Sequence, residues 1–252
     1  MDKFMQLNEV AIIIPVRYGS TRLPGKPLIE VNNKPIIQWV YERASLSKLA
    51  GNVIAATDDI NIFNAVKKFG GRVEMTSSDH QSGSDRIAEI VKKNPAIKIA
   101  VNVQGDEPLI SPESIDSTIK CLIDDEKADI ATLARIIDDR EEIENPNTVK
   151  VVLDKSNYAM YFSRSPIPYE RNSDQASHYG HIGLYAYKRE SLIKMTELEQ
   201  TQLEKAESLE QLRALENGMR IKVIIVNYKP IGIDTEEDLI EFKRLQTCSS
   251  SL

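Results

Sequence analysis

Residues 10–28 read VAIIIPVRYGSTRLPGKPL, and this stretch decides the expected fold. It opens with an unbroken apolar run and ends in a turn rich in glycine, proline and positive charge. Continuous β-branched strands are typical of parallel sheets that helices cover, and the loop after the first strand of such a sheet faces the ligand crevice. The stretch therefore predicts a buried strand that delivers a basic loop to a binding site.

The rest of the chain repeats the alternation of strand and helix. Strand-like runs recur at 52–58, 99–106, 129–137, 149–154, 181–187 and 221–228. Helical patterns lie at 36–44, 59–69, 84–93, 112–125, 204–217 and 236–246. This order predicts an α/β fold with a mostly parallel sheet covered by helices on both faces.

Composition limits the class of protein. The 252 residues carry 32 basic and 38 acidic side chains, a net charge of -6, which argues against a nucleic-acid binder. The apolar run before Arg17 is only about seven residues long, too short for a signal peptide or a membrane span. Cys121 and Cys248 form no C-x-x-C pair, so a zinc cluster is not expected. We therefore expect a cytoplasmic protein without membrane insertion.

The length fits one domain, expected over residues 1–247. The polar, proline-containing region of about residues 155–220 breaks the alternation and predicts an insertion or lid. The last residues, 248–252, are expected to form a disordered tail.

The loop after the first strand gathers positive charge. Arg17, Arg22 and Lys26 fall within ten residues, and no acid appears until Glu30. The spacing does not match a Walker A loop, and Pro27 stands where Ser or Thr would hold magnesium. Either the loop binds phosphate or its charges only aid solubility, and three cations on a restricted turn favour phosphate.

Carboxylates end two other apolar runs. Asp106 follows the run at 99–103 and Asp234 follows a short run before the last helix. Carboxylates opposite a basic loop are the usual ligands of magnesium that arrives with a polyphosphate. Asp234 has an equally good alternative as an acid beside a helix N-terminus, and the two roles can coexist.

Helix-start signals place further groups. Ser82 with Asp85, and Thr235 with Asp238, have the spacing of capping boxes. The loop DHQSG (79–83) would thus present backbone N–H groups that an anion or a base edge could bind. His181 opens an apolar strand, where a satisfied core histidine is the usual outcome.

These strings together resemble the cytidylyltransferases that activate 3-deoxy-manno-octulosonate (Kdo). The resemblance runs in order from about residue 10 to 244 and rests on IIPVRYGSTRLPGKPL (13–28), DHQSGSDRIAEI (79–90), VNVQGDEPLI (101–110), VKVVLD (149–154), YAMYFSRSPIP (158–168), HIGLYAY (181–187), LEQLRALENG (209–218) and GIDTEEDL (232–239). It implies a mononucleotide-binding, Rossmann-like fold, a homodimer, and a magnesium-dependent reaction of CTP with Kdo that gives CMP-Kdo and pyrophosphate.

The resemblance also implies roles for single residues. Those expected to hold the triphosphate are Arg17, Ser20, Thr21, Arg22 and Lys26. Those expected near the cytosine are Asp79, Ser82 and Gly83, and those expected to hold Mg²⁺ are Asp106 and Asp234. The expected sugar-site residues are Gln104, Arg164, His181, Tyr185, Glu210 and Gln211. In this interpretation Arg17, Arg22, Lys26, Asp106 and Asp234 are catalytic, the region of about 155–220 supplies the sugar site and dimer contacts, and Arg164 binds the Kdo carboxylate.

Two alternatives stay open at the level of the sequence. The acceptor could be another acidic sugar, either sialic acid or an amino-substituted Kdo, because the triphosphate loop does not separate these. The chain could instead be a sensor that binds CTP without turning it over, although such a module has no use for paired metal carboxylates.

Overall fold

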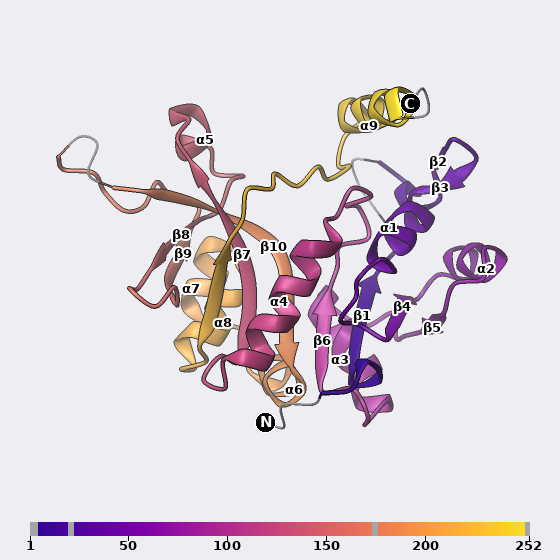
Figure 1. The fold of residues 1–252 in the computed structure, drawn as a ribbon, viewed down its shortest axis with the longest axis horizontal. Coiled ribbons are helices and arrows are strands. Elements are labelled where there is room, and N and C mark those ends of the chain that lie inside the picture. The colour runs from indigo at the N-terminus through magenta and orange to yellow at the C-terminus, as the bar shows by residue number, and fades with distance from the viewer. Residues whose placement is uncertain (1–4, 20–22, 173–175, 250–252) are drawn as a thin grey trace. The chain divides into compact units, whose positions relative to one another are not determined.

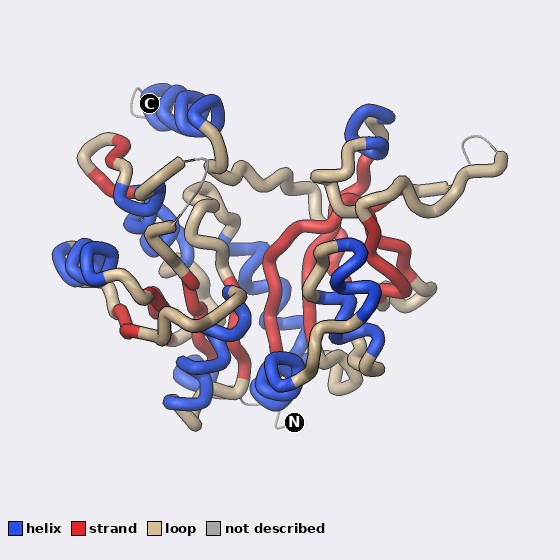
Figure 2. The backbone as a smooth tube through the Cα atoms, turned by 180° about the vertical axis from the view of Figure 1, so that it is seen from behind, coloured by secondary structure: helices blue, strands red, loops and turns tan. Residues whose placement is uncertain are grey.

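The computed structural model describes residues 5–19, 23–172 and 176–249. The chain forms two compact units (Figure 1). One comprises residues 6–116 and 230–252, and the other comprises residues 117–229 with the first five residues. Each unit contains both strands and helices (Figure 2).

The unit of residues 6–116 contains a parallel sheet in the order β6-β1-β4-β5. Its strands are β1 (Val10–Pro15), β4 (Asn52–Thr57), β5 (Val73–Met75) and β6 (Ile99–Asn102). Strand β1 pairs with β4 on one side and β6 on the other, and its residues from Val10 to Ile14 are all buried. A fully apolar strand suits this position because both of its faces are covered. The prediction of a buried first strand is confirmed.

Helices connect and flank these strands. They are α1 (Ile36–Ala44), α2 (Ile60–Lys68), α3 (Gly83–Lys93), α4 (Pro112–Asp124), within which the chain passes to the other unit, and α9 (Glu236–Ser249). Short elements complete this unit: the 3₁₀ turns η1 (Leu7–Glu9) and η2 (Lys26–Leu28), and the hairpin of β2 (Glu30–Val31) and β3 (Lys34–Pro35). The Ser82 and Asp85 side chains each accept a backbone N–H of the other residue, so the predicted capping box of α3 is confirmed.

The last helix docks on the first part of the chain. Phe242 on α9 is fully buried and meets the Trp39 ring of α1 edge-on, with 5.8 Å between ring centroids. The indole N–H of Trp39 donates to the carbonyl of Val31 at 3.1 Å, which fixes the ring. This aromatic contact holds the start of α9, and with it Asp234, in the same unit as β1.

The unit of residues 117–229 contains both parallel and antiparallel strand pairs around β7. Its strands are β7 (Ile130–Ile137), β8 (Lys150–Leu153), β9 (Ala159–Ser163), β10 (His178–Lys188) and β11 (Ile221–Ile225). Strand β7 is parallel to β11 and antiparallel to β10, while β8 pairs antiparallel with β9 and β10. The helices are α5 (Arg140–Glu144), α6 (Arg189–Glu197), α7 (Gln202–Glu207) and α8 (Gln211–Glu216).

Two sequence predictions change here. The single helix expected over 204–217 is two helices, because Ser208 adopts a left-handed conformation with φ of 52° and ends α7. Helix α9 extends through Ser249, so residues 248 and 249 of the predicted tail are helical, and residues 250–252 lie outside the described part of the chain. Among the residues that the structure describes, no helix has the length and apolar character needed to cross a membrane.

Candidate active site

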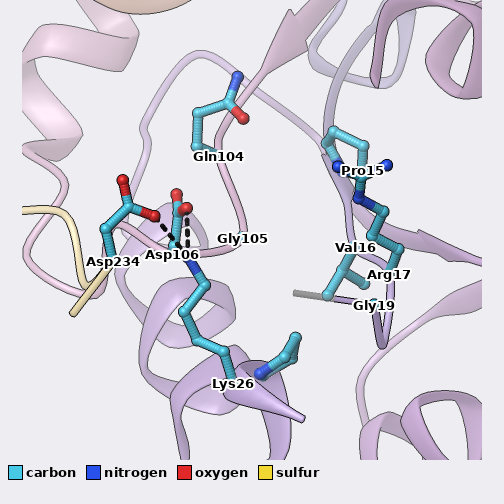
Figure 3. Close-up of a pocket in the computed structure, with 10 residues that line it drawn as sticks. Pro15, Val16, Arg17, Gly19, Lys26, Gln104, Gly105, Asp106 and Asp234 are labelled. Carbon is cyan, nitrogen blue, oxygen red and sulfur yellow. Dashed lines mark hydrogen bonds and ion pairs between the residues drawn. The ribbon is translucent and has the colours of Figure 1, made fainter. Parts of the chain in front are cut away.

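A cavity of about 590 Å³ lies at the end of β1 and β6. These strands are parallel neighbours, so their carboxyl ends share one edge of the sheet, where ligands of α/β proteins bind. The lining residues come from four separate stretches and are Pro15, Val16, Arg17, Gly19, Lys26, Pro27, Gln104, Gly105, Asp106 and Asp234 (Figure 3). The cavity therefore brings together predicted phosphate-binding, metal-binding and sugar-site residues.

Lys26 joins the two carboxylates of this cavity. Its Nζ donates to Asp106 Oδ2 at 2.7 Å and to Asp234 Oδ1 at 3.0 Å (Figure 3). The lysine starts η2, directly after Gly25, whose φ of 67° is a left-handed conformation that glycine adopts without steric cost. Pro27 restrains the backbone on the other side. The backbone of the turn is thus restrained, and from it the Lys26 ammonium group reaches both carboxylates.

The two aspartates are also tied to each other through the backbone. The N–H of Ile233 donates to the carbonyl of Asp106 at 2.9 Å. Helix α9 is capped by Thr235 and Asp238, which exchange side-chain and backbone hydrogen bonds as predicted. Although burial opposes ionisation, the N–H groups of Asp234 and Thr235 lower the pKa of Asp238. Asp238 thus caps α9, while the Asp234 carboxylate accepts a hydrogen bond from Lys26.

Part of the predicted phosphate loop cannot be placed. Ser20, Thr21 and Arg22 lie outside the residues that the structure describes, and their roles stay predictions. Arg17 and Gly19, which precede them, line the cavity.

A second cavity of about 310 Å³ shares part of its wall with the first. Its lining residues are Pro15, Val16, Arg17, His80, Gln81, Ser82, Gly83, Arg86 and Gln104. A Cβ atom at Gly83 would come within 3.3 Å of the Pro15 ring, so glycine allows the start of α3 to approach β1 closely. Ser82 and Gly83, predicted near the cytosine, line this cavity, whereas Asp79 is exposed and is not one of the lining residues.

Sequence reasoning missed Arg86 and left His80 without a committed role. Arg86 is buried, and its guanidinium donates to Thr76 Oγ1 and pairs with Asp58 Oδ2 at 3.1 Å. Arg86 lies in the first turn of α3, where a positive charge is unfavourable because of the helix dipole. This unusual position was the signal in the sequence that could have identified Arg86. His80 bonds Glu89, whose pKa falls to about 2 because hydrogen bonds from Lys93, Ser77 and His80 outweigh its burial.

Glu107 directly follows Asp106 in the sequence. Burial raises the pKa of Glu107 to about 7, and the adjacent Asp106 carboxylate adds to the shift. A carboxyl group with a pKa near neutrality beside a site is able to hold or release a proton.

The unit of residues 117–229 groups several predicted sugar-site residues. On β10, the His181 ring lies 5.3 Å from the Tyr185 ring and 5.0 Å from that of Phe162. His181 Nε2 bonds Thr132 Oγ1 at 2.9 Å. Burial lowers the pKa of His181 to about 3 and raises that of Tyr185 above its usual range. At neutral pH both side chains are therefore uncharged hydrogen-bonding groups.

Glu210 and Gln211 lie at the start of α8. Gln211 is buried, and its Nε2 has no hydrogen-bond partner among the described residues. A buried amide donor without a partner lowers the stability of the fold unless a ligand accepts its hydrogen bond.

Arg164 follows β9 and is held by backbone carbonyls. Its guanidinium donates to the carbonyls of Glu207 at 2.8 Å, Pro146 at 3.0 Å and Ser208 at 3.5 Å. The Glu207 carboxylate accepts the backbone N–H of Arg164 at 2.9 Å. Since a guanidinium has five N–H groups, the bonds to described residues leave one N–H on each terminal nitrogen for a ligand.

The chain is similar to known proteins over most of its length. Residues 11–221 match the model of the family described as cytidylyltransferase. A 3-deoxy-manno-octulosonate cytidylyltransferase of Thermodesulfovibrio yellowstonii is 52% identical over 240 residues, covering 90% of this chain and 94% of the relative. The enzyme of that name from Parabacteroides distasonis is 52% identical over 238 residues, covering 90% and 94%.

A solved structure agrees with these relatives. CMP:2-keto-3-deoxy-manno-octonic acid synthetase, determined as a complex with CTP, is 43% identical and superposes with a TM-score of 0.91 over 95% of this chain and 99% of its own. This match confirms the predicted α/β, Rossmann-like fold class. The family match, the sequence identity and the structural agreement together show that the chain belongs to the cytidylyltransferase family, among the 3-deoxy-manno-octulosonate cytidylyltransferases.

Proposed function

We propose that this cytidylyltransferase transfers CMP from CTP to the anomeric hydroxyl of Kdo, giving CMP-Kdo and pyrophosphate for lipopolysaccharide biosynthesis. The observation that carries the proposal is the cavity in which Lys26 meets Asp106 and Asp234 beside Arg17. It occurs in a chain that is 52% identical to proteins named for this reaction.

The phosphates of CTP would lie in the larger cavity. Arg17 and Lys26 supply positive charge there, and Gly19 leaves room for close backbone approach. Positive groups fixed around a triphosphate stabilise the charge that moves onto departing pyrophosphate. Arg22 would add to this charge.

The cytosine would lie in the smaller cavity, where α3 begins. Ser82 and Gly83 line that cavity at the N-terminal end of the helix. Backbone N–H groups at a helix start are suited to oxygen acceptors such as a base carbonyl. Asp79 stays a predicted contact of the base.

Mg²⁺ is the proposed cofactor, and the donor set fits it. One ammonium group lies within 3.0 Å of an oxygen of each aspartate, so Asp106 and Asp234 converge on a single cation position. Among the described residues no group of three His, Cys, Asp or Glu side chains is arranged to hold a metal. Magnesium usually takes one or two carboxylates and completes its shell with water and substrate phosphate. Bound there, it would neutralise phosphate charge and lower the proton affinity of the attacking hydroxyl.

Kdo would be held by uncharged groups and by Arg164. Neutral His181 and Tyr185 offer hydrogen bonds to sugar hydroxyls, and the Gln211 Nε2 lacks a protein partner among the described residues. Gln104 and Glu210 stay predicted contacts. The sugar acid would bind the two remaining N–H groups of Arg164.

The transfer needs no side-chain nucleophile. The anomeric hydroxyl of Kdo attacks the α-phosphorus in line with the departing pyrophosphate. CTP is a polyanion and Kdo carries a carboxylate, so the two substrates repel each other in water. The chain lowers this barrier by holding both substrates in position and by opposing their charge with Arg17, Lys26 and Arg164.

Arg164→Lys is expected to raise the KM for Kdo about tenfold or more and to leave the KM for CTP within about twofold, because an ammonium is a point charge and cannot replace a planar fork. Initial rates at varied Kdo and fixed CTP check this. Arg140→Lys, at an exposed arginine of the same unit that pairs with Glu144, is the matched control. An unchanged KM for Kdo would make Arg164 a purely structural residue.

We place the enzyme in the cytoplasm, in keeping with the free Cys121 thiol. We also propose a homodimer, and the exposed Ile136, Met160 and Tyr169 of the unit of residues 117–229 give a second copy apolar surface to cover.

The experiment that tests the function supplies CTP and Mg²⁺ with one sugar at a time and measures pyrophosphate release. We expect turnover with Kdo and much slower turnover with sialic acid. Turnover with amino-substituted Kdo but not with Kdo would change the assigned acceptor. Release that stays at background with every sugar, while CTP binds, would make the chain a CTP sensor.

A further inference from the structure

The Lys26 ammonium occupies the cation position between the two carboxylates. Its Nζ lies 2.7 Å from Asp106 and 3.0 Å from Asp234. The lysine side chain is only 10% exposed, whereas those of Asp106 and Asp234 are 33% and 49% exposed. The positive group is therefore the inner member of the cluster, and the negative groups border the cavity.

The same oxygens cannot serve the ammonium and a divalent cation at once. Magnesium binds carboxylate oxygens at about 2.0–2.1 Å and demands near-octahedral geometry. A cation that bound Asp106 Oδ2 and Asp234 Oδ1 would approach the Lys26 Nζ closely, and like charges at such distances repel strongly near a protein surface. A divalent cation can therefore bind these two oxygens only after the Lys26 ammonium has moved.

The local structure allows this movement of the side chain alone. Gly25 and Pro27 fix the backbone of the turn, while the lysine has a flexible four-carbon stem. The stem faces a cavity of about 590 Å³ that Arg17 also lines. A triphosphate in that cavity would offer the ammonium new anionic partners and so compensate for the loss of both aspartates.

We infer that Lys26 is an internal counterion that keeps Asp106 and Asp234 together and closed to metal until nucleotide phosphates draw its ammonium away. Divalent cation and nucleotide then bind as coupled ligands, each raising the affinity for the other. The inference rests on the proposed function, because it takes a nucleoside triphosphate as the ligand of the cavity.

The test measures Mn²⁺ binding to the nucleotide-free protein, using the electron paramagnetic resonance signal of free Mn²⁺. Lys26→Met is expected to bind Mn²⁺ at least about tenfold more tightly than the wild type, because a competing unit charge is removed at contact distance. Lys120→Met removes an exposed lysine that pairs with Asp124 and is the matched control, expected to bind as the wild type does. Adding Asp106→Asn to Lys26→Met should abolish the gain.

Equal Mn²⁺ affinity of the wild type and Lys26→Met would overturn the inference. Neither sugar nor turnover enters this comparison, so its outcome is distinct from failure of the wild type to form CMP-Kdo.

Crystals of the wild type provide a second measurement that does not depend on the folding of a variant. After soaking in MnCl₂ alone, we expect no anomalous peak between Asp106 and Asp234. After soaking in MnCl₂ with CTP, we expect a peak there and the Lys26 ammonium on the phosphates. A peak in MnCl₂ alone would contradict the inference.

Discussion

Asp106→Asn is expected to lower kcat about 100-fold or more at saturating CTP and Kdo, the size of a single lost electrostatic contribution in an enzyme site. The carboxamide loses the charge that a divalent cation requires. The change also removes one of the two carboxylates that Lys26 contacts among the described residues. Steady-state assays of pyrophosphate release measure the loss.

Asp124→Asn is the matched control for this substitution. Asp124 is an exposed aspartate whose Oδ2 accepts a hydrogen bond from Lys120 at 2.6 Å, so the control also removes a lysine–aspartate pair. Its kcat should equal that of the wild type, because exposed pairs contribute little. If Asp106→Asn kept a near-wild-type kcat, Asp106 would have no place in the chemistry.

Arg213→Met is expected to lower the free energy of unfolding by about 3–5 kcal/mol, because it leaves the buried Glu204 carboxylate without its positively charged partner. Arg213 Nε donates to Glu204 Oε2 at 2.8 Å and its terminal nitrogen to Oε1 at 2.5 Å. Both side chains are buried. The pair joins α7 to α8, the helix that carries Gln211, and urea unfolding followed by circular dichroism measures its loss.

Two further variants separate the buried charge from the loss of packing. Arg244→Met removes an arginine from the exposed pair with Glu241 and should cost less than about 1 kcal/mol. The double variant Glu204→Leu with Arg213→Met removes both charges and should recover much of the lost stability. If Arg213→Met alone cost as little as Arg244→Met, the pair would not hold the two helices together.

The parts of the fold that local sequence determines were predictable. The buried strand β1 and the capping boxes of α3 and α9 follow from apolar runs and from side chains three residues apart. Strand β5 has only three residues and gives too short a pattern to read. The break between α7 and α8 depends on a left-handed serine, a conformation that serine rarely adopts and that its neighbours do not reveal.

Some features of the candidate site could likewise be predicted from the sequence, and others could not. Because parallel strands end at one edge of a sheet, the position of Asp106 after β6 opposite the loop of Arg17 could be predicted. The contact of Lys26 with both aspartates could not, since it joins residues 80 and 208 positions apart through the docking of α9. The burial of Arg86 against Asp58 likewise depends on a tertiary contact.

The most direct test of the account follows the α-phosphorus of CTP by ³¹P nuclear magnetic resonance in the presence of the enzyme, Mg²⁺ and Kdo. We predict that the CTP signals give way to one new phosphodiester signal, that of CMP-Kdo, and to pyrophosphate in equal amount. CTP signals that persist unchanged, or that give CMP or CDP without a sugar phosphodiester, would contradict it.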